Sequence, residues 1–356
     1  MNLPESPIVI AGWGAVSPAG WGAAPLLHAV GPGGVVPPPE PCLREGQSRP
    51  ALLRRVPAPD GVPDLWREPR LRRASAIGRF AAHAAMEALD QSGRAESVRR
   101  GDWRLGILFT TVNGCVDFSR RFFAEVLRDP AHASPILFPE TVFNAPSSHL
   151  GAILGSTWAN HTLLGDSSQF VAALESAARL LLRREVDGCL VCGAEEGDWL
   201  TAEGARWFDD STPCAEGAGA LYLERSAAGA SPPRVVLDRL ADVQTFSARG
   251  ARADALAAVR EDLEVMSAEG SGRLLCDGRT GHASRDAAES TVWADWQGGR
   301  ISVRQVLGNG FAAATAWQSV IAASFLADPE RSFFEALVSA SGENGAAAGA
   351  RLIRFP

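Results

Sequence analysis

Residues 159–196 constrain the fold of this chain more than any other stretch. A short apolar run leads into a turn of small residues (165–168), and a long helix rich in Ala and Leu follows. A second apolar run (188–193) then ends in the acidic pair Glu195 and Glu196. Strand, turn, helix and buried strand in this order are typical of an α/β protein whose sheet is covered on both faces.

The same alternation continues on both sides of this stretch. Apolar runs predict strands at 8–12, 105–109, 219–223, 235–240, 273–276, 335–340 and 350–355. Helical spacing predicts helices over 74–93, 114–128, 253–268 and 311–327. Residues 31–63 are rich in Pro and Gly and predict an irregular surface excursion, and residues 134–156 are expected to form a loop.

Composition excludes several classes of function. The chain of 356 residues has a formal net charge of −7, which argues against a nucleic-acid or anionic-membrane partner. All 34 basic residues are arginine, so a Schiff-base lysine and a P-loop lysine are excluded. No apolar run approaches the roughly 18 residues of a membrane span, and no basic leader precedes the first apolar run. We therefore expect a cytoplasmic protein.

Cys189 and Cys192 form a CxxC motif, but the motif lies inside the predicted strand 188–193 and has no second ligand pair. A zinc site needs four ligands, whereas a free buried cysteine behaves as a small hydrophobic residue. The sequence therefore predicts a structural role for both cysteines and no metal.

Six phrases occur in the order in which β-ketoacyl synthases carry them: VIAGWGAVSPAG, SPILFPETVFNAPSSHLGAILGS, CAEGAGALYLE, RTGHASRDAAES, RQVLGNGFAAATA and SASGENGAAAGARL. The chain therefore resembles β-ketoacyl synthases of the thiolase superfamily over nearly its whole length. The resemblance implies a thiolase-like α/β fold in five layers, α-β-α-β-α. It also implies two similar halves, 1–230 (including the excursion 31–63) and 231–356, and dimerisation through strands near the nucleophile.

Decarboxylative condensation in this family needs a thiolate that accepts the acyl chain, two histidines and an oxyanion hole. Against the family's motifs, Asp166 stands at the cysteine, and Asp277 or Gly278 at the first histidine. Asn309 stands at the second histidine, and Arg304 at the lysine five residues earlier. A carboxylate would give only a labile anhydride, and an asparagine cannot shuttle a proton. The three changes together predict a protein that does not condense.

Other interpretations of these residues stay open. Asp166 with Gln169 fits a capping box at the start of the helix that follows. Ser167 with His282 would make a hydrolase of this fold, although a loop histidine is more often exposed to solvent. A third possibility is an enzyme that decarboxylates malonyl-carrier protein to start chains. Such relatives keep their histidines, however, and Asn309 argues against this function.

Chain-length factors are relatives that do not condense and that pair with an active ketosynthase in type II polyketide, polyene or fatty-acid-like biosynthesis. The resemblance implies a heterodimer in which this chain shapes the acyl tunnel, with acyl carrier protein bound through the complex and no cofactor. The expected tunnel and dimer-interface residues follow strand 105–109: Thr111, Val112, Asn113, Cys115, Val116 and Phe118. Glu343 falls where active members keep a gating Phe, which predicts that no substrate enters this chain's own pocket.

Overall fold

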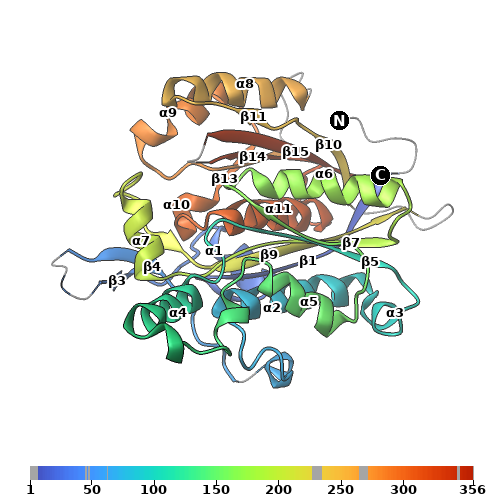
Figure 1. The fold of residues 1–356 in the computed structure, drawn as a ribbon. Coiled ribbons are helices and arrows are strands. Elements are labelled where there is room, and N and C mark those ends of the chain that lie inside the picture. Colours follow the sequence, from blue (N-terminus) through green and yellow to red (C-terminus); the bar gives the residue numbers. More distant parts are fainter. Residues whose placement is uncertain are drawn as a thin grey trace.

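The computed structural model describes residues 7–44, 46, 49–61, 63–226, 235–263, 272–342 and 345–355. Figure 1 shows five layers: outer helices, a sheet, central helices, a second sheet, and outer helices on the opposite side. The five-layer architecture expected from the sequence is confirmed. Both sheet layers belong to one 12-stranded hydrogen-bonded sheet among the described residues.

The two sheet layers repeat one pattern of strand directions. The lower layer in Figure 1 has the order β1 (Ile8–Ser17), β9 (Gly217–Arg225), β7 (Gly188–Glu195), β5 (Leu105–Thr111) and β6 (Asn160–Leu164). The upper layer has the order β10 (Val235–Leu240), β15 (Ala346–Arg354), β14 (Glu335–Ser341), β12 (Arg273–Asp277) and β13 (Gly299–Ser302). In each layer two antiparallel pairings are followed by two parallel ones. The chain is therefore built from two similar α/β halves.

The two layers meet where β1 pairs with β10, Ile8 opposite Leu237 and Val9 opposite Val236. Short strands extend the sheet: β2 (Gly20–Trp21) beside β1 and β11 (Gln244–Thr245) beside β15. A separate three-stranded sheet contains β3 (Glu40–Cys42), β4 (Ala51–Arg54) and β8 (Cys214–Ala215).

The central layer consists mainly of α6 (Gln169–Leu182) and α11 (Ala312–Ala327) (Figure 1). Every residue of α11 from Ala312 to Leu326 is buried, because sheet strands cover the helix on both sides. Close approach of α11 to β9 requires a glycine: a Cβ on Gly219 would lie 2.8 Å from the backbone carbon of Ala316. The largest hydrophobic core, which includes Phe170, Trp317 and Val320, fills this layer.

The outer layers cover the remaining faces of the sheets (Figure 1). Helices α2 (Ala76–Ser92), α3 (Ala95–Arg99), α4 (Val116–Arg128) and α5 (Ala145–Leu154) lie below, and α8 (Arg252–Asp262) and α9 (Ala283–Val292) lie above. The remaining α-helices are α1 (Ala23–Ala29), α7 (Trp199–Arg206) and α10 (Val303–Leu307). In the described part of the chain, no helix has the length and hydrophobicity of a membrane span.

The elements predicted from the sequence are mostly confirmed, and 235–240 has the bounds expected of it. The expected loop 134–156 is wrong in part, because its second half forms α5, which has Pro146 in its first turn and ends at Gly155 in the left-handed region (φ 68°). The excursion 31–63 is more regular than expected, since it supplies β3 and β4. The predicted boundary between the halves, at 230 and 231, lies outside the described residues.

The packing of α2 on β1 depends on Gly12, and a substitution at this residue tests it. A Cβ on Gly12 would lie 2.0 Å from the carbonyl oxygen of Ala88, so Gly12→Ala must displace the helix backbone. We expect Gly12→Ala to lower the free energy of unfolding by about 1–3 kcal/mol, measured by urea denaturation.

Gly204→Ala is the matched control. Gly204 lies in α7, and a Cβ there would meet nothing within 4 Å. Alanine has the higher helix propensity, so this variant should be unchanged or more stable by up to about 1 kcal/mol. Equal stability of Gly12→Ala and the wild-type protein would contradict the close packing of α2 on β1.

Candidate functional site

A cavity of about 440 Å³ lies where the two central helices begin. Its walls come from the loop after β5, the turn before α6, α7, α10 and the loop before α11. Asp166, Ser167, Arg304 and Asn309 supply polar groups to the wall. These are residues that the sequence placed at or beside the family's catalytic positions.

Asp166 is buried, and neighbouring donors already use its carboxylate. Oδ1 accepts hydrogen bonds from the Ser168 N–H at 3.0 Å and from the Ser168 hydroxyl, and Oδ2 accepts one from the Ala346 N–H at 3.3 Å. Gly342 lies so close that a Cβ there would be 1.9 Å from Asp166 Cγ. The capping box expected from Asp166 and Gln169 is therefore wrong. The carboxylate instead links the turn before α6 to the C-terminal strand.

Asn309 is fixed through its backbone to the segment that precedes β9. Its N–H donates to the Pro213 carbonyl at 2.8 Å, and its carbonyl accepts from the Ala215 N–H at 2.9 Å. Its side-chain Oδ1 accepts from the Phe311 N–H at 3.2 Å. Phe311 has a φ of 47°, a conformation that few residues other than glycine adopt, and it initiates α11. The side-chain amide of Asn309 is therefore held beside the N-terminus of α11.

Arg304 links the cavity to a buried ion network. Its guanidinium donates to the Ser167 hydroxyl. Glu289, fully enclosed in the core, accepts from the Gly278 N–H at 3.1 Å. Burial raises the pKa of Glu289, as does the charge of Asp277, whereas the positive charge of Arg304 opposes this rise.

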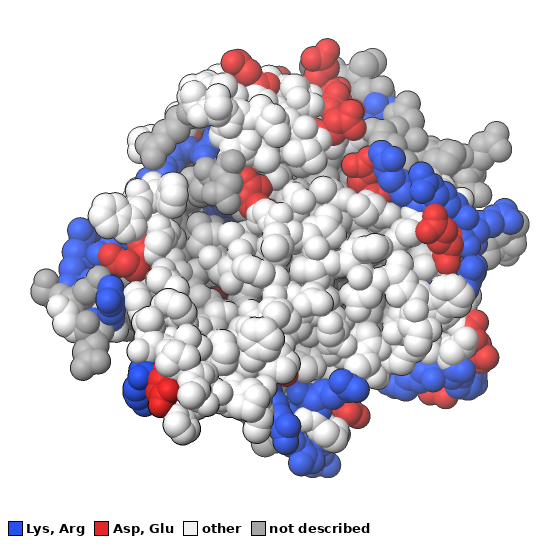
Figure 2. All heavy atoms as spheres, viewed as in Figure 1, with Lys and Arg blue, Asp and Glu red and all other residues white. Residues whose placement is uncertain are grey.

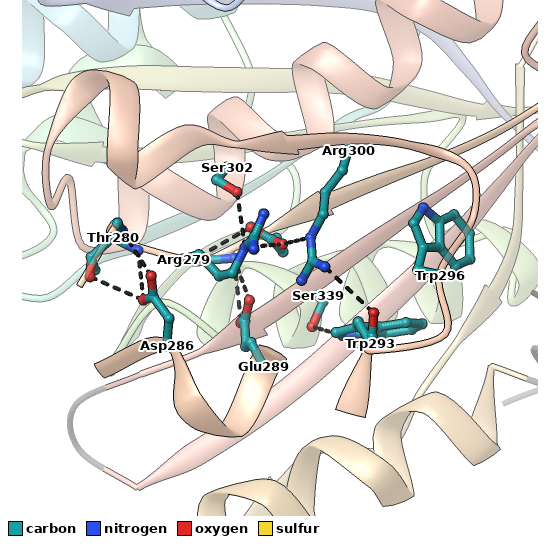
Figure 3. A network of polar contacts seen from close by, with 12 residues as sticks. Arg279, Thr280, Asp286, Glu289, Trp293, Trp296, Arg300, Ser302 and Ser339 are labelled. Carbon is teal, nitrogen blue, oxygen red and sulfur yellow. Dashed lines mark hydrogen bonds and ion pairs between the residues drawn. The ribbon is translucent and has the colours of Figure 1, made fainter. Parts of the chain in front are cut away.

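Asp277 is fully buried at the end of β12 and pairs with Arg279 at 3.0 Å and Arg300 at 2.5 Å. Figure 3 shows Arg279 and Arg300 converging in this network, with Ser302 beside Arg279. Both partners of such a buried pair are needed, since removing one leaves an uncompensated charge. Residue 277 is therefore part of an internal ion-pair network.

A buried carboxylate at the end of β7 holds one wall of the cavity. Glu195 accepts hydrogen bonds from the N–H groups of Val112 at 2.5 Å and Asn113 at 3.1 Å, and from the Asn113 side-chain amide at 3.1 Å. Burial raises its pKa from 4.5 to about 7, although these hydrogen bonds lower it. The loop after β5, which forms this wall, is therefore held by the carboxylate of Glu195 on the neighbouring strand β7.

Glu196, the next residue, joins two helices in the same way. Its carboxylate accepts from the N–H of Ile77 at 3.1 Å and of Asp117 at 2.9 Å, in the first turns of α2 and α4. These N–H groups have no partner inside their own helices. Burial raises the pKa of Glu196 to about 7. The acidic pair noted in the sequence, Glu195 and Glu196, therefore stabilises the lower half by binding backbone N–H groups.

No family model matches the sequence, and no curated protein matches it either. Solved structures do match. The ishigamide ketosynthase/chain length factor has a TM-score of 0.80 at 22% identity, over 98% of this chain and 100% of that chain. A type II PKS acyl-carrier protein in complex with its ketosynthase has a TM-score of 0.79 at 17% identity, over 100% of both chains. A β-ketoacyl synthase from Burkholderia phymatum has a TM-score of 0.75 at 17% identity, over 99% of this chain and 100% of that chain. This chain has the thiolase-like ketosynthase fold.

Within the ketosynthase fold, the structure brings together only part of the predicted set. Asp166 and Asn309 line one cavity together with Arg304. Asp277 and Gly278 do not line it. The Asp277 side chain is held by two arginines, and the Gly278 N–H binds Glu289.

The structure separates Ser167 from His282. His282 is exposed just before α9, and its N–H donates to the Thr280 hydroxyl at 3.4 Å. Ser167 is buried and accepts from Arg304. Across the described ranges, no hydrogen bond joins Ser167 to a histidine. A serine hydrolase on this ketosynthase framework would lack its nucleophile–base pair.

The expected tunnel and dimer-interface residues lie in different surroundings. Val112, Asn113 and Val116 line the cavity. Thr111 and Cys115 are buried, and burial raises the pKa of the Cys115 thiol to about 12. Their role in a tunnel stays a prediction.

Phe118 faces a separate hollow of about 560 Å³, and the guanidinium of Arg121 lies 5.0 Å from the centre of its ring. Glu343, the expected gating position, lies outside the described residues. Cys189 and Cys192 are buried, free thiols of β7. Across the described residues, no group of three His, Cys, Asp or Glu could hold a metal ion.

Two parts of the wall were missed from the sequence. Helix α7 contributes Leu200 and Thr201, and the segment after it contributes Phe208. The start of α7 was signalled by Asp198, whose side chain accepts from the Leu200 N–H at 3.0 Å. Phe143 comes from the expected loop and lies over Gly114, where a Cβ would be 2.5 Å from the ring. No local pattern marks Phe143, because its position depends on a contact between separate loops.

The raised pKa of Glu195 predicts a pH-dependent stability. The folded chain holds a proton on Glu195 up to about pH 7, whereas the ordinary value is 4.5, so the stability from this protonation is full below pH 4.5 and lost above pH 7. Glu195→Gln cannot titrate. We therefore expect its free energy of unfolding to rise relative to wild type, by on the order of 1–3 kcal/mol, as pH increases from 5 to 8.

Urea denaturation at several pH values measures this difference. Glu96→Gln, the same substitution at an exposed residue of α3, is the control. A pH-independent difference for Glu195→Gln would show that the carboxylate does not change its charge in this range.

Proposed function

We propose that this chain is a non-catalytic, chain-length-factor-type subunit that pairs with an active ketosynthase and shapes its acyl tunnel. The strongest support comes from the polar residues that line the cavity. A carboxylate and an amide, Asp166 and Asn309, face the space where condensation would need a thiolate and an imidazole. The fold that positions them is complete, whereas the reactive groups are missing.

The hydrogen bonds of Asp166 support a structural role. Its carboxylate accepts three hydrogen bonds from Ser168 and Ala346, which fix its orientation. Asn309 holds the Phe311 N–H and has no proton to transfer at neutral pH. A malonyl-carrier-protein decarboxylase is not favoured for this reason, and a hydrolase is not favoured because Ser167 lacks a base.

An unprotected edge strand supports pairing with another chain. β6 is the last strand of the large sheet, and among the described strands it pairs only with β5. Its sequence NHTLL holds none of the charged residues or prolines that usually protect such an edge. Trp158 and Leu164, beside and within this strand, are about half exposed. An open edge with apolar neighbours fits a subunit interface.

The apolar surface continues beyond β6. Figure 2 shows few charged side chains over the middle of the face seen in Figure 1. Large apolar side chains are exposed on α4 and on the segment that follows it: Phe123, Leu127, Ile136 and Phe138. Exposed large apolar side chains that gather on one face are typical of an interaction surface. A partner subunit would remove it from water.

A carrier protein would reach the complex through a basic surface. The hollow beside Phe118 is lined by four arginines and two carboxylates: Arg72, Arg73, Arg79, Arg121, Asp117 and Glu140. These arginines gather on a chain whose net charge is −7, so they form a local field that attracts an acidic surface. The solved ketosynthase complex with an acyl-carrier protein, which has the same fold, is consistent with this partner.

Co-expression with a cysteine-bearing ketosynthase tests the pairing. We expect a stable 1:1 complex, and we expect Leu164→Asp to weaken it at least about tenfold, because a charge would be buried at the interface. Val35→Asp, a change at an exposed apolar residue of the 31–63 segment, should leave the complex intact. Homodimers of this chain in the presence of its partner would contradict the proposal.

Product length tests the role in the tunnel. In the reconstituted complex, Val112→Trp adds bulk to the wall and is expected to shorten the longest acyl chain on the carrier protein, whereas Val112→Ala should lengthen it. Intact-mass spectrometry of the carrier protein reports the length. Val35→Trp is the control, because Val35 is exposed in the 31–63 segment, lines neither hollow and should not change the distribution. Equal product lengths for all three variants would exclude this wall from the tunnel.

A further inference from the structure

A second hollow, of about 1140 Å³, lies between α1 and α2 and shares no lining residue with the cavity of Asp166 and Asn309. Its walls also include β1, β2, α3, α5 and a short 3-10 helix, η1 (Asp64–Arg67). The hollow is slightly larger than the roughly 300–1,000 Å³ of typical small-molecule sites. A ligand with several charged groups therefore has room in it.

Two tryptophans give the hollow rigid aromatic walls. Trp13 comes from β1 and Trp21 from β2, and both side chains are partly buried. The Trp21 Nε1–H donates to the Pro57 carbonyl at 2.8 Å. The same ring lies edge-on to the rings of Trp66 and His83, and each of their centres is 5.2 Å away. Because the face of an indole attracts cations, these fixed rings suit a positively charged group and the hydrocarbon chain beside it.

Carboxylates outnumber cations in the lining of the hollow, where the acidic residues are Asp64, Glu68, Glu87 and Asp90. Arg99 is the one guanidinium of this lining in the described part of the chain, and it pairs with Glu96 at 3.6 Å. Asp64 pairs with Arg67 at 3.3 Å, but both side chains are exposed to solvent, which weakens the pair. Burial lowers the pKa of His83, so its imidazole is neutral near pH 7. The hollow therefore has a negative field that attracts a cation.

Glu87 is the carboxylate that the fold holds most firmly in this hollow. Its oxygens accept hydrogen bonds from the Ala15 N–H at 3.0 Å and from the Ala23 N–H at 2.9 Å, so it joins β1 to the start of α1. Burial raises its pKa, whereas the two backbone hydrogen bonds lower it, and across the described residues no arginine pairs with it. A partly buried carboxylate is stabilised by a cation beside it. A bound ammonium group would supply that missing charge.

We propose that this hollow binds a linear polyamine, a small compound whose ammonium groups are separated by short hydrocarbon chains. One ammonium donates to Glu87, and the others lie near Asp90 and the two carboxylates on and after η1. The hydrocarbon chains contact the tryptophans and the apolar side chains of Leu65 and Met86. A single ammonium would leave most of these carboxylates without a cation, so a polyamine fits better than a monoamine. The site goes beyond the proposed function, because it uses no residue assigned to the partner interface or the tunnel.

Calorimetric titration of the full-length chain with spermidine tests the site, at about 50 mM salt, where charge attraction is only partly screened. We expect spermidine to bind saturably, and more tightly than 1,6-hexanediamine, which has one charge fewer. The uncharged analogue 1,6-hexanediol should bind at least about tenfold more weakly than the diamine, because it gains no charge attraction from the carboxylates.

Three variants test the residues of the site. Glu87→Gln keeps the shape of the side chain and removes its charge, so it should weaken spermidine binding about tenfold. Trp13→Leu removes an aromatic face and should weaken binding about threefold. Asp90 is exposed on α2, so Asp90→Asn tests the site independently of any effect of Glu87→Gln on folding, and it should weaken binding about twofold.

Asp254→Asn is the matched control, because Asp254 is exposed on α8 and does not line the hollow, so this variant should bind spermidine as wild type does. Absence of saturable spermidine binding, equal binding of the diamine and the diol, or unchanged binding by both Glu87→Gln and Asp90→Asn would each overturn the proposal. Tighter binding of an acetylated tri-arginine amide, which has the same charge as spermidine, would also overturn it and assign the hollow to a basic protein segment. None of these results bears on subunit pairing, which co-expression tests separately.

Discussion

The rest of the structure depends on burying α11 between two sheet layers. Fifteen consecutive residues of this helix are removed from water, and small residues on the strands, such as Gly219, allow the backbones to approach. The central helices α6 and α11 both begin at the same place, so the residues before them, Asp166 and Asn309, must face a common cavity. The position of the cavity therefore follows from the way the two central helices pack in the core.

Because the packing of the core positions the cavity, the fold persists without a reactive cysteine or histidines in it. The wall of the cavity is held by carboxylates that act on the backbone: Glu195 on the loop after β5, Glu196 on the starts of two helices, and Asp166 on the C-terminal strand. Buried acceptors that satisfy several N–H groups contribute to structure whatever the chemistry nearby. A thiolate and two imidazoles can be lost from such a site without loss of the fold.

The sequence predicted those parts of the molecule that local patterns encode. The predicted strand 105–109 is a continuous apolar run inside β5, and α2 ends at Gly93 in the left-handed region, as its sequence indicated. Asp166 and Asn309 could be assigned because short motifs surround them. The contributions of α7 and Phe143 to the cavity could not be predicted, since they arise from packing between segments far apart in the chain. For the same reason, the orientation of Phe118 away from Val112 could be learned only from the structure.

The central claim is that all covalent chemistry of the complex belongs to the partner subunit. Intact-mass spectrometry of both subunits tests it most directly, after the 1:1 complex has been incubated with an acyl-loaded carrier protein. An acyl adduct on the partner's cysteine and none on this chain is the expected result. An adduct on this chain, at Asp166 or Ser167, would contradict the claim and show that this chain carries out covalent chemistry itself.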